Sequence, residues 1–334
     1  MGFAFGRSLA CMGWPGGLAF LVASWVAGAA PAVIEGRGLA NASAAVRIGS
    51  HRILVGSDEH NALLLYDVRT GGRPLKSFPT GPWLDLEPDA READFEGAAR
   101  IGDTLYWIGS HSRNRQGKVR SERQRLLALR VADEDGDVRL SPMGPPLTTL
   151  LQSLCSTPGL ADFGLGAAAR LEPKEPGGLN IEGLAATPEG GLYIGFRSPV
   201  PDGKALMALL MNPAELIAGR PARWGPPARL DLGGQGIRDA VWSGRRYYLL
   251  GGSPGEGGRT QLYRWAGPGV APEVLKSPGL KNLNAEGMVI FGTPARPRLL
   301  VLSDDGNRRV NAGKEAQDRT FRMLWVDLPP ENGP

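Results

Sequence analysis

The sequence predicts an all-β fold, a β-propeller with five blades. Two observations favour it: a high density of turn-forming residues and a strand pattern that recurs along the chain. Of the 334 residues, 48 are Gly and 28 are Pro, about twice the average share. Because 42% of the residues are hydrophobic and no collagen period exists, the composition is that of a packed protein built from short strands and tight turns.

The recurring pattern begins with an acidic residue followed by glycine. Three copies begin at the pairs Glu96-Gly97, Glu182-Gly183 and Glu286-Gly287. In each copy a short apolar run, a turn and a second apolar run follow the pair, and then a third strand-like run. A fourth copy has Asp239 at the acidic position, and a fifth copy, near Ser43, has no acid. Antiparallel strands repeated in this way are typical of propeller blades.

The end of the repeat and its one long interruption complete the predicted architecture. The last copy stops after its third strand, which would leave an exposed sheet edge. We therefore expect residues 32–35, just before the first copy, to complete the last blade and close the ring. Residues 144–178 have no strand pattern, and we interpret them as an insert outside the blades. Six blades is the alternative, with this segment as the additional one.

The N-terminus has the pattern of a secretory signal peptide. Arg7 is the only charged residue before Glu35, and the apolar run 18–26 is followed by the small residues 27–29. This run is too short to span a bilayer. The sequence thus predicts a signal peptide over 1–29, a single propeller domain over 30–330, and a periplasmic or secreted protein with no membrane span in the mature chain. An uncleaved anchor is the alternative.

Charge and histidine content argue against two classes of partner. The 38 Lys and Arg residues exceed the 34 Asp and Glu residues by a net charge of +4. No basic run is interleaved with aromatic residues, so we expect no nucleic-acid partner. The three histidines are too few for a His-based zinc site to be expected. We expect a monomer that takes a small anionic ligand.

The repeated acids suggest a site at one end of the central channel. In a propeller the first strand of each blade lines this channel, and residues two apart on a strand face the same way. Carboxylate and amide oxygens of this kind suit a hard cation such as Ca²⁺. We predict metal ligands at Glu96, Glu182, Asp239 and Glu286, with further oxygens from Asp94, Asn180 and Asn284. The alternative, of equal weight, is that the acids hold neighbouring blades together through backbone N–H groups or Arg238, without a metal.

The ends of the second strands lie at the same end of the channel, since consecutive strands are antiparallel. They bring further polar residues to this end, among them Asp58, His111 and Arg197. Two of the loops that follow are rich in arginine and suit an anion such as a phosphate ester. We predict substrate binding by Arg113, Arg197, Arg238 and Asp304, with His111 as the candidate general base. Solvated loop arginines are the alternative.

Several stretches resemble a known bacterial family, DUF3616. The most distinctive is 109–114, Gly-Ser-His-Ser-Arg-Asn; others are 180–184, 195–197, 236–239 and 302–306. The resemblance covers about 46–326 and implies a propeller-type fold, but it transfers no catalytic residues. More remotely, the Glu-Gly start of the inner strand is similar to phytase-like and gluconolactonase-like propellers. That similarity implies channel-mouth acids that bind Ca²⁺ or another divalent cation and support ester hydrolysis.

The sequence therefore predicts an exported propeller that binds a divalent cation at its channel mouth. If it is an enzyme, the expected activity is metal-dependent hydrolysis of phosphate or other anionic esters. The alternative is a non-catalytic propeller that binds a ligand or a protein. The residues leave this choice open, because fold analogy alone does not assign chemistry.

Overall fold

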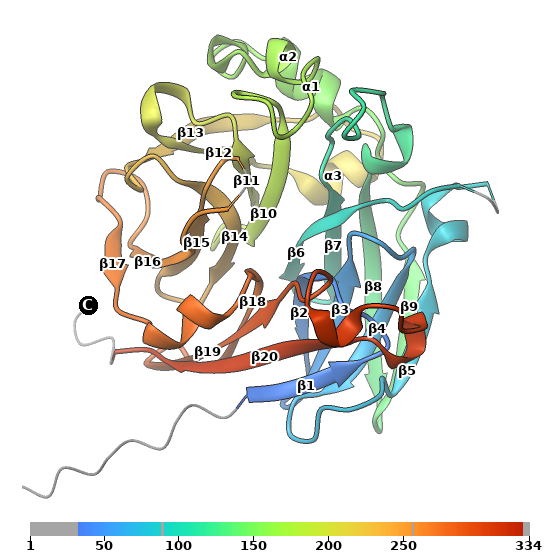
Figure 1. Cartoon of the computed structure of the whole chain (residues 1–334). Coiled ribbons are helices and arrows are strands. Elements are labelled where there is room, and N and C mark those ends of the chain that lie inside the picture. Colours follow the sequence, from blue (N-terminus) through green and yellow to red (C-terminus); the bar gives the residue numbers. More distant parts are fainter. Residues whose placement is uncertain (1–32, 88–89, 256, 330–334) are drawn as a thin grey trace, which may run out of the picture. The chain divides into compact units, whose positions relative to one another are not determined.

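The computed structural model describes residues 33–87, 90–255 and 257–329; the predicted signal peptide lies outside them. The described residues form five four-stranded antiparallel sheets arranged as a ring (Figure 1). The inner strands of successive blades contact one another, and the inner strand of the fifth blade contacts that of the first. The all-β, five-bladed propeller predicted from the sequence is confirmed.

Each blade is a meander whose first strand lies next to the channel. The first blade contains β2 (Ala42–Ile48), β3 (Arg52–Ser57), β4 (Ala62–Asp67) and β5 (Lys76–Pro79). The second contains β6 (Phe95–Ile101), β7 (Thr104–Gly109), β8 (Leu126–Glu134) and β9 (Asp137–Pro142). The third contains β10 (Asn180–Ala186), β11 (Leu192–Ser198), β12 (Ala205–Leu210) and β13 (Trp224–Leu230). The fourth contains β14 (Gly236–Trp242), β15 (Tyr247–Gly252), β16 (Gln261–Trp265) and β17 (Glu273–Leu275).

The fifth blade is assembled from both ends of the described chain. It contains β18 (Ala285–Thr293), β19 (Arg296–Ser303), β20 (Thr320–Asp327) and, as its outer strand, β1 (Val33–Arg37). β1 pairs antiparallel with β20, with Val33 opposite Leu324 and Arg37 opposite Thr320. The predicted closure is confirmed: β1 covers an edge of β20 that would otherwise expose unpaired backbone groups.

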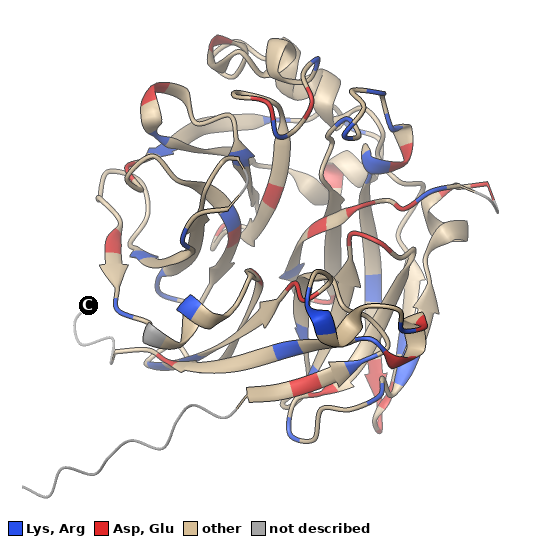
Figure 2. Ribbon diagram, viewed as in Figure 1, with Lys and Arg blue, Asp and Glu red and all other residues tan. Residues whose placement is uncertain are grey.

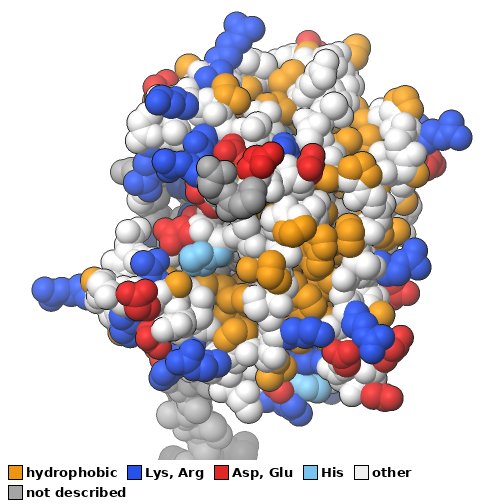
Figure 3. Space-filling view, turned by 90° about the vertical axis from the view of Figure 1, so that its right-hand side faces the viewer, with side chains coloured by type: hydrophobic (Ala, Val, Ile, Leu, Met, Phe, Trp, Pro, Cys, Tyr) orange, Lys and Arg blue, Asp and Glu red, His pale blue; other side chains and the backbone are white. Residues whose placement is uncertain are grey.

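The second strands of the blades are apolar on both faces because each blade is packed between two others. All four residues of the run 105–108, Leu-Tyr-Trp-Ile, are buried. Aromatic rings connect neighbouring blades: Tyr66 of β4 lies edge-on to Phe321 of β20 at 5.3 Å, and Tyr193 of β11 lies edge-on to Trp265 of β16 at 5.6 Å. In the side view, apolar side chains form a patch bordered by charged ones (Figure 3).

Helices are few and short among the described residues. The segment 144–178 contains α1 (Leu150–Ser156) and α2 (Leu165–Ala168), and α3 (Pro213–Ile217) lies between β12 and β13. Leu150 and Leu165 belong to the same buried cluster as Ile181 of β10, so the segment packs onto the propeller core. None of the described helices is long and apolar enough to cross a membrane. Short 3-10 helices occupy 81–84, 121–123, 161–163, 201–203, 278–282, 309–311 and 316–318.

A register shift near the start of every inner strand positions the site. In each blade one residue is skipped in the pairing with the second strand, as in a β-bulge, which re-aims a side chain. The skipped residues are Ser43, Glu96, Glu182, Arg238 and Glu286, which we call the bulge ring.

The glycine after the acid has a steric explanation. A Cβ on Gly97 would lie 2.9 Å from Leu184 Cβ, and one on Gly183 would lie 2.6 Å from Ile237 Cγ2 of the next blade. The Glu-Gly pair therefore combines a channel-facing acid with close approach of the next blade.

Candidate functional site

The bulge ring brings one residue from each of the five blades to the same end of the channel. Its members differ in charge: three glutamates, one arginine and one serine. Around the molecule as a whole, acidic and basic residues are likewise interleaved (Figure 2). The partners of each member decide which part of the ring is available to a ligand.

Arg238 joins the two glutamates on either side of it. Its Nε donates to Glu182 Oε2 of the third blade at 3.3 Å, and its Nη2 donates to Glu286 of the fifth. Its Nη1 donates to Asn284 Oδ1 at 3.0 Å. Burial opposes the charge of Arg238, but the neighbouring carboxylates outweigh it and place the pKa of the guanidinium above its usual value. Arg238 is therefore a permanent cation between two ring carboxylates.

Glu182 has further partners, so its carboxylate is fully engaged. Arg197 of β11 donates from Nη1 to Glu182 Oε1 at 2.7 Å, and Asn180 Nδ2 donates to the same oxygen at 2.8 Å. The remaining nitrogens of Arg197 donate to Ser253 O at 2.9 Å and Gly255 O at 2.6 Å. Arg197 is thus fixed by the loop after β15 while it neutralises Glu182.

Asp239 lies outside the bulge ring, because the register places Arg238 at the position equivalent to the glutamates. The Asp239 carboxylate accepts the N–H of Ala240 at 2.7 Å and that of Met288, in the next blade, at 2.6 Å. Burial raises its pKa well above the usual value, although both N–H groups oppose this. Asp239 therefore joins blades through backbone N–H groups, as in the alternative that the sequence left open.

Asp94 and its neighbours form an ion-paired group beside the second blade. Asp94 has a left-handed backbone, with φ of 55°, and its carboxylate accepts the Ser110 hydroxyl. Arg123 Nη1 lies 2.9 Å from Asp94 Oδ2, and Arg123 Nη2 donates to Glu92 at 2.8 Å. Burial raises the pKa of Asp94 to about 6, against the opposing charge of Arg123. Asp94 is therefore already neutralised by a partner on its own blade.

Asn284 and Asp304 extend the network at the fifth blade. Asn284 Nδ2 donates to Asp304 Oδ2 at 3.0 Å and to Glu286 Oε1 at 3.3 Å. Burial raises the pKa of Glu286 to about 8, while Arg238 opposes the rise. Burial also raises the pKa of Asp304. The acids on this side of the channel are thus hydrogen-bonded to an amide, an arginine or both.

Glu96 and Asp58 differ from all of these acids. Among the described residues, Glu96 makes no hydrogen bond or ion pair, and Asp58 Oδ1 is buried without a partner. The pKa of Glu96 is raised well above its usual value, first by burial and then by the charges of Glu182, Asp94 and Asp58. Burial, Asp94 and Glu286 raise that of Asp58 in the same way. The two carboxyl groups share one electrostatic environment, in which the charges of Arg123 and Arg238 also act on Glu96 without forming an ion pair with it.

Asp58 was placed at this end of the channel by the sequence but not assigned to the site. The sequence contained a signal for it: Ser57 ends β3 and Asp58 follows, just as Ser303 ends β19 and Asp304 follows. Ser57 and Ser303 also occupy equivalent pairing positions opposite their inner strands. Asp58 is therefore the first-blade counterpart of Asp304.

His111 and Arg113 contact backbone rather than the bulge ring. His111 is 1% exposed and shares a 2.9 Å hydrogen bond between Nδ1 and Gly109 O, while its Nε2 is buried without a partner. Burial lowers the pKa of His111 to about 4, so the ring is neutral at pH 7. Arg113 donates to Ala169 O at 2.9 Å and to Gly117 O at 2.8 Å, which links its loop to the insert.

Most of the predicted metal ligands are engaged by partners within the protein. Among the described residues, no group of three or more His, Cys, Asp or Glu side chains could hold a metal ion. Glu182 and Glu286 contact Arg238, and Asp239 accepts backbone N–H groups, so these three do not fit a common Ca²⁺ site. Glu96 and Asp58 are the carboxylates that remain, and Ca²⁺ binding stays a prediction.

Comparison with known families gives a clear result. A family model described as "Protein of unknown function (DUF3616)" matches residues 41–137 and 146–316. The chain belongs to the DUF3616 family. The resemblance seen in the sequence is thereby confirmed; the unmatched residues 138–145 cover most of β9 and the first two residues of the insert. No curated protein matches this DUF3616 chain.

Solved structures with a similar fold belong to diverse proteins. The allergen Mala s 1 of Malassezia sympodialis has a TM-score of 0.49 at 10% identity and covers 92% of this chain and 99% of its own. The xylose complex of a GH43_1 enzyme from Xanthomonas citri gives 0.43 at 15%, covering 88% and 90%. The PQQ-bound aldose sugar dehydrogenase of Streptomyces coelicolor gives 0.40 at 14%, covering 89% and 100%. None of these similarities assigns an activity to the DUF3616 chain.

Proposed function

We propose that this DUF3616 chain is a ligand-binding propeller whose channel mouth takes up a cation between Glu96 and Asp58. The cation is either a divalent metal ion or the positively charged group of an organic ligand. The observation that supports this is that Asp58 Oδ1 is buried without a partner and that no described residue forms a hydrogen bond or ion pair with Glu96, whereas the neighbouring acids have partners. Ester hydrolysis stays a prediction from the sequence.

The balance of charge at the channel mouth supports cation binding. The electrostatic neighbours of Glu96 include four carboxyl groups, against two guanidinium groups from Arg123 and Arg238. The carboxyl groups belong to Asp58, Asp94, Glu182 and Glu286. A buried carboxylate without a partner is costly, so it either keeps its proton or acquires a cation. A ligand cation would supply the direct partner that Glu96 and Asp58 lack.

The raised pKa values predict that binding is linked to proton release. Burial and the neighbouring acids disfavour the ionised forms of Glu96 and Asp58, so each group holds a proton to a higher pH than a free carboxyl group does. A bound cation stabilises the ionised forms and displaces this proton. Affinity should therefore increase as the pH rises.

Titration of the purified chain with CaCl₂, and separately with the diamine putrescine, tests the proposal. We expect one of the two to bind, with proton uptake by the buffer and a rise in Tm. The variants Glu96→Gln and Asp58→Asn should each weaken that binding at least about tenfold, an energy of about 1.4 kcal/mol. Glu134→Gln, on an exposed hairpin, is the matched control and should bind normally.

Stability measurements distinguish a role of Glu96 in cation binding from a purely structural role. If Glu96 serves only the fold, Glu96→Gln should destabilise the chain. If its charge is retained for binding, the variant should be as stable as the parent or more so above pH 7, because a costly ionised group is removed. Absence of binding by both probes, or unchanged binding by Glu96→Gln and Asp58→Asn, would refute the proposal.

A further inference from the structure

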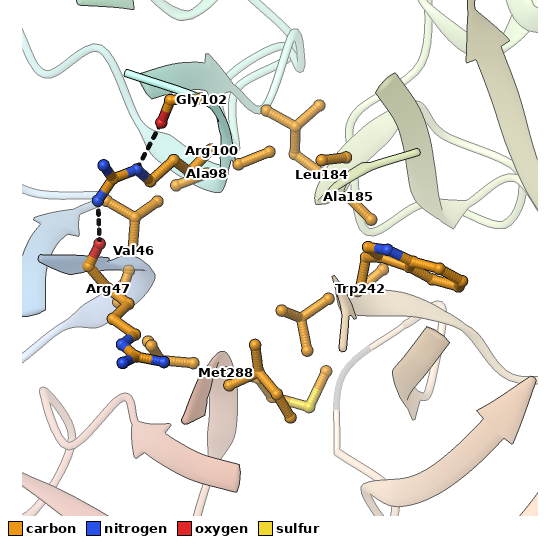
Figure 4. Close-up of a pocket in the computed structure, with 16 residues that line it drawn as sticks. Val46, Arg47, Ala98, Arg100, Gly102, Leu184, Ala185, Trp242 and Met288 are labelled. Carbon is orange, nitrogen blue, oxygen red and sulfur yellow. Dashed lines mark hydrogen bonds between the residues drawn. The ribbon is translucent and has the colours of Figure 1, made fainter. Parts of the chain in front are cut away.

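The other end of the channel contains a cavity with a different chemistry. Its volume is about 330 Å³, and all five inner strands line it beyond their bulge-ring residues (Figure 4). The walls are apolar, with Val46, Ala98, Leu184, Ala185 and Met288 placed around the hollow (Figure 4). The described lining residues include no Asp or Glu; their charged members are Arg47 and Arg100.

The polar residues that line this cavity occupy equivalent positions in the inner strands. The residues four after the bulge-ring members are Arg47, Arg100, Ala186, Trp242 and Ile290. The two arginines thus come from adjacent blades, and Trp242 comes from the fourth. Figure 4 shows the arginines on one side of the cavity and Trp242 on the opposite side.

The two arginines are held in place to different extents. Arg100 donates to Gly102 O at 2.7 Å and to Arg47 O at 3.3 Å, and its Nη2 lies 3.5 Å from the exposed Asp103. Arg47 donates from Nε to Gly49 O at 2.7 Å, and its guanidinium lies 5.1 Å from the centre of the Phe291 ring. No described residue accepts a hydrogen bond from the Nη1 and Nη2 atoms of Arg47.

We propose that this cavity binds a small carboxylate with an apolar body, such as a medium-chain fatty acid or an aromatic acid. The apolar walls would take up the body, and the paired terminal nitrogens of Arg47 would take the carboxylate in the two-bond geometry that guanidinium groups favour. The volume lies at the lower end of the range for small-molecule sites, about 300–1,000 Å³. Two arginines and no acidic residue in the lining disfavour a cationic ligand, in contrast to the carboxylate-rich end of the channel at the bulge ring.

Calorimetric titration with three probes of equal chain length tests the assignment: octanoate, octan-1-ol and octylamine. Octanoate should bind at least about tenfold more tightly than octan-1-ol, and octylamine should bind least well. Arg47→Gln should lower the affinity for octanoate to that of octan-1-ol and leave octan-1-ol unaffected. Ala98→Leu, which adds bulk to the partly buried wall, should weaken both. Arg139→Gln, on an exposed hairpin, is the matched control and should change nothing.

Two results would overturn the assignment. One is equal binding of octanoate and octan-1-ol; the other is octanoate binding that Arg47→Gln leaves unchanged. Arg47 lies at the surface of the cavity, so this variant keeps the test valid even if Ala98→Leu fails to fold. Glu96→Gln should not alter octanoate binding. A result against cation binding at Glu96 and Asp58 can therefore be told apart from a result against carboxylate binding in this cavity.

Discussion

The two ends of the channel are built from the same five strands but have opposite chemistry. At the start of these strands the bulge ring collects carboxylates and arginines, with Glu96 and Asp58 left without a partner. A few residues further on, the same strands form apolar walls beside two arginines. In each strand a single skipped residue marks the change, because the bulge re-aims one side chain without disturbing the packing that follows. The comparison shows how one repeated strand can supply two separate surfaces.

Replacement of Arg238 should cause the largest loss of stability. The change should be confined to the end of the channel that contains the bulge ring. Arg238→Met leaves Glu182 and Glu286 buried without their shared cation. Removing one partner of a buried ion pair typically costs about 3–5 kcal/mol. We expect a loss of that size in the free energy of unfolding, measured with urea at pH 9, above the raised pKa of Glu286.

Two further measurements sharpen this prediction. Arg139→Met, which breaks exposed ion pairs, should change the free energy of unfolding by less than about 1 kcal/mol. Octanoate binding by folded Arg238→Met should remain normal if the two ends are independent. A loss below 1 kcal/mol in Arg238→Met would show that Arg238 is not the central cation of the ring.

A methyl group at the bulge should have an intermediate effect. In Gly183→Ala the new Cβ would lie 2.6 Å from Ile237 Cγ2, so the third and fourth blades must separate slightly. Overpacking of this kind typically costs about 1–3 kcal/mol. Gly81→Ala is the control, because nothing lies within 4 Å of its new Cβ and its φ is not positive. Equal melting temperatures for the two variants would contradict the proposed role of the Glu-Gly pair.

The pH dependence of stability should be smaller but directional. In the folded chain burial raises the pKa of Glu286 to about 8 and that of Asp94 to about 6. At pH values between the ordinary carboxyl pKa and these raised values, the folded state therefore binds more protons than the unfolded state. The free energy of unfolding then falls as the pH rises through this interval. His111, with its pKa lowered to about 4, has the opposite effect, but only below about pH 6.5.

The interval from pH 6.5 to 8 therefore isolates the raised carboxyl groups. Stability should fall there by at most about 1.4 kcal/mol per pH unit for each group that titrates. Urea unfolding at several pH values measures this slope, and Glu286→Gln should make it shallower. A free energy of unfolding that is flat or rises over this interval would mean that Arg238 and its neighbours keep these acids ionised.

Much of the fold could be predicted because its signals are local. Alternation and turn residues define each strand, and five copies of one pattern define five blades. The incomplete last copy indicated that an N-terminal strand would close the ring, which the pairing of β1 with β20 confirms. The positions of Glu96, Glu182 and Glu286 at equivalent points followed from the same repeat.

The sequence by itself thus favoured five blades, with six as the alternative, and indicated the closure of the ring and a common end of the channel for the acids. Only the tertiary structure decided that Arg238 rather than Asp239 completes the ring, because a shift of one residue turns a side chain to the other face. It also decided which acids have partners, since Arg238 reaches two glutamates far away in the sequence and leaves Glu96 with none. The strand pattern depends on residues that are neighbours in the sequence, whereas the neutralisation of each charge depends on distances between residues of different blades.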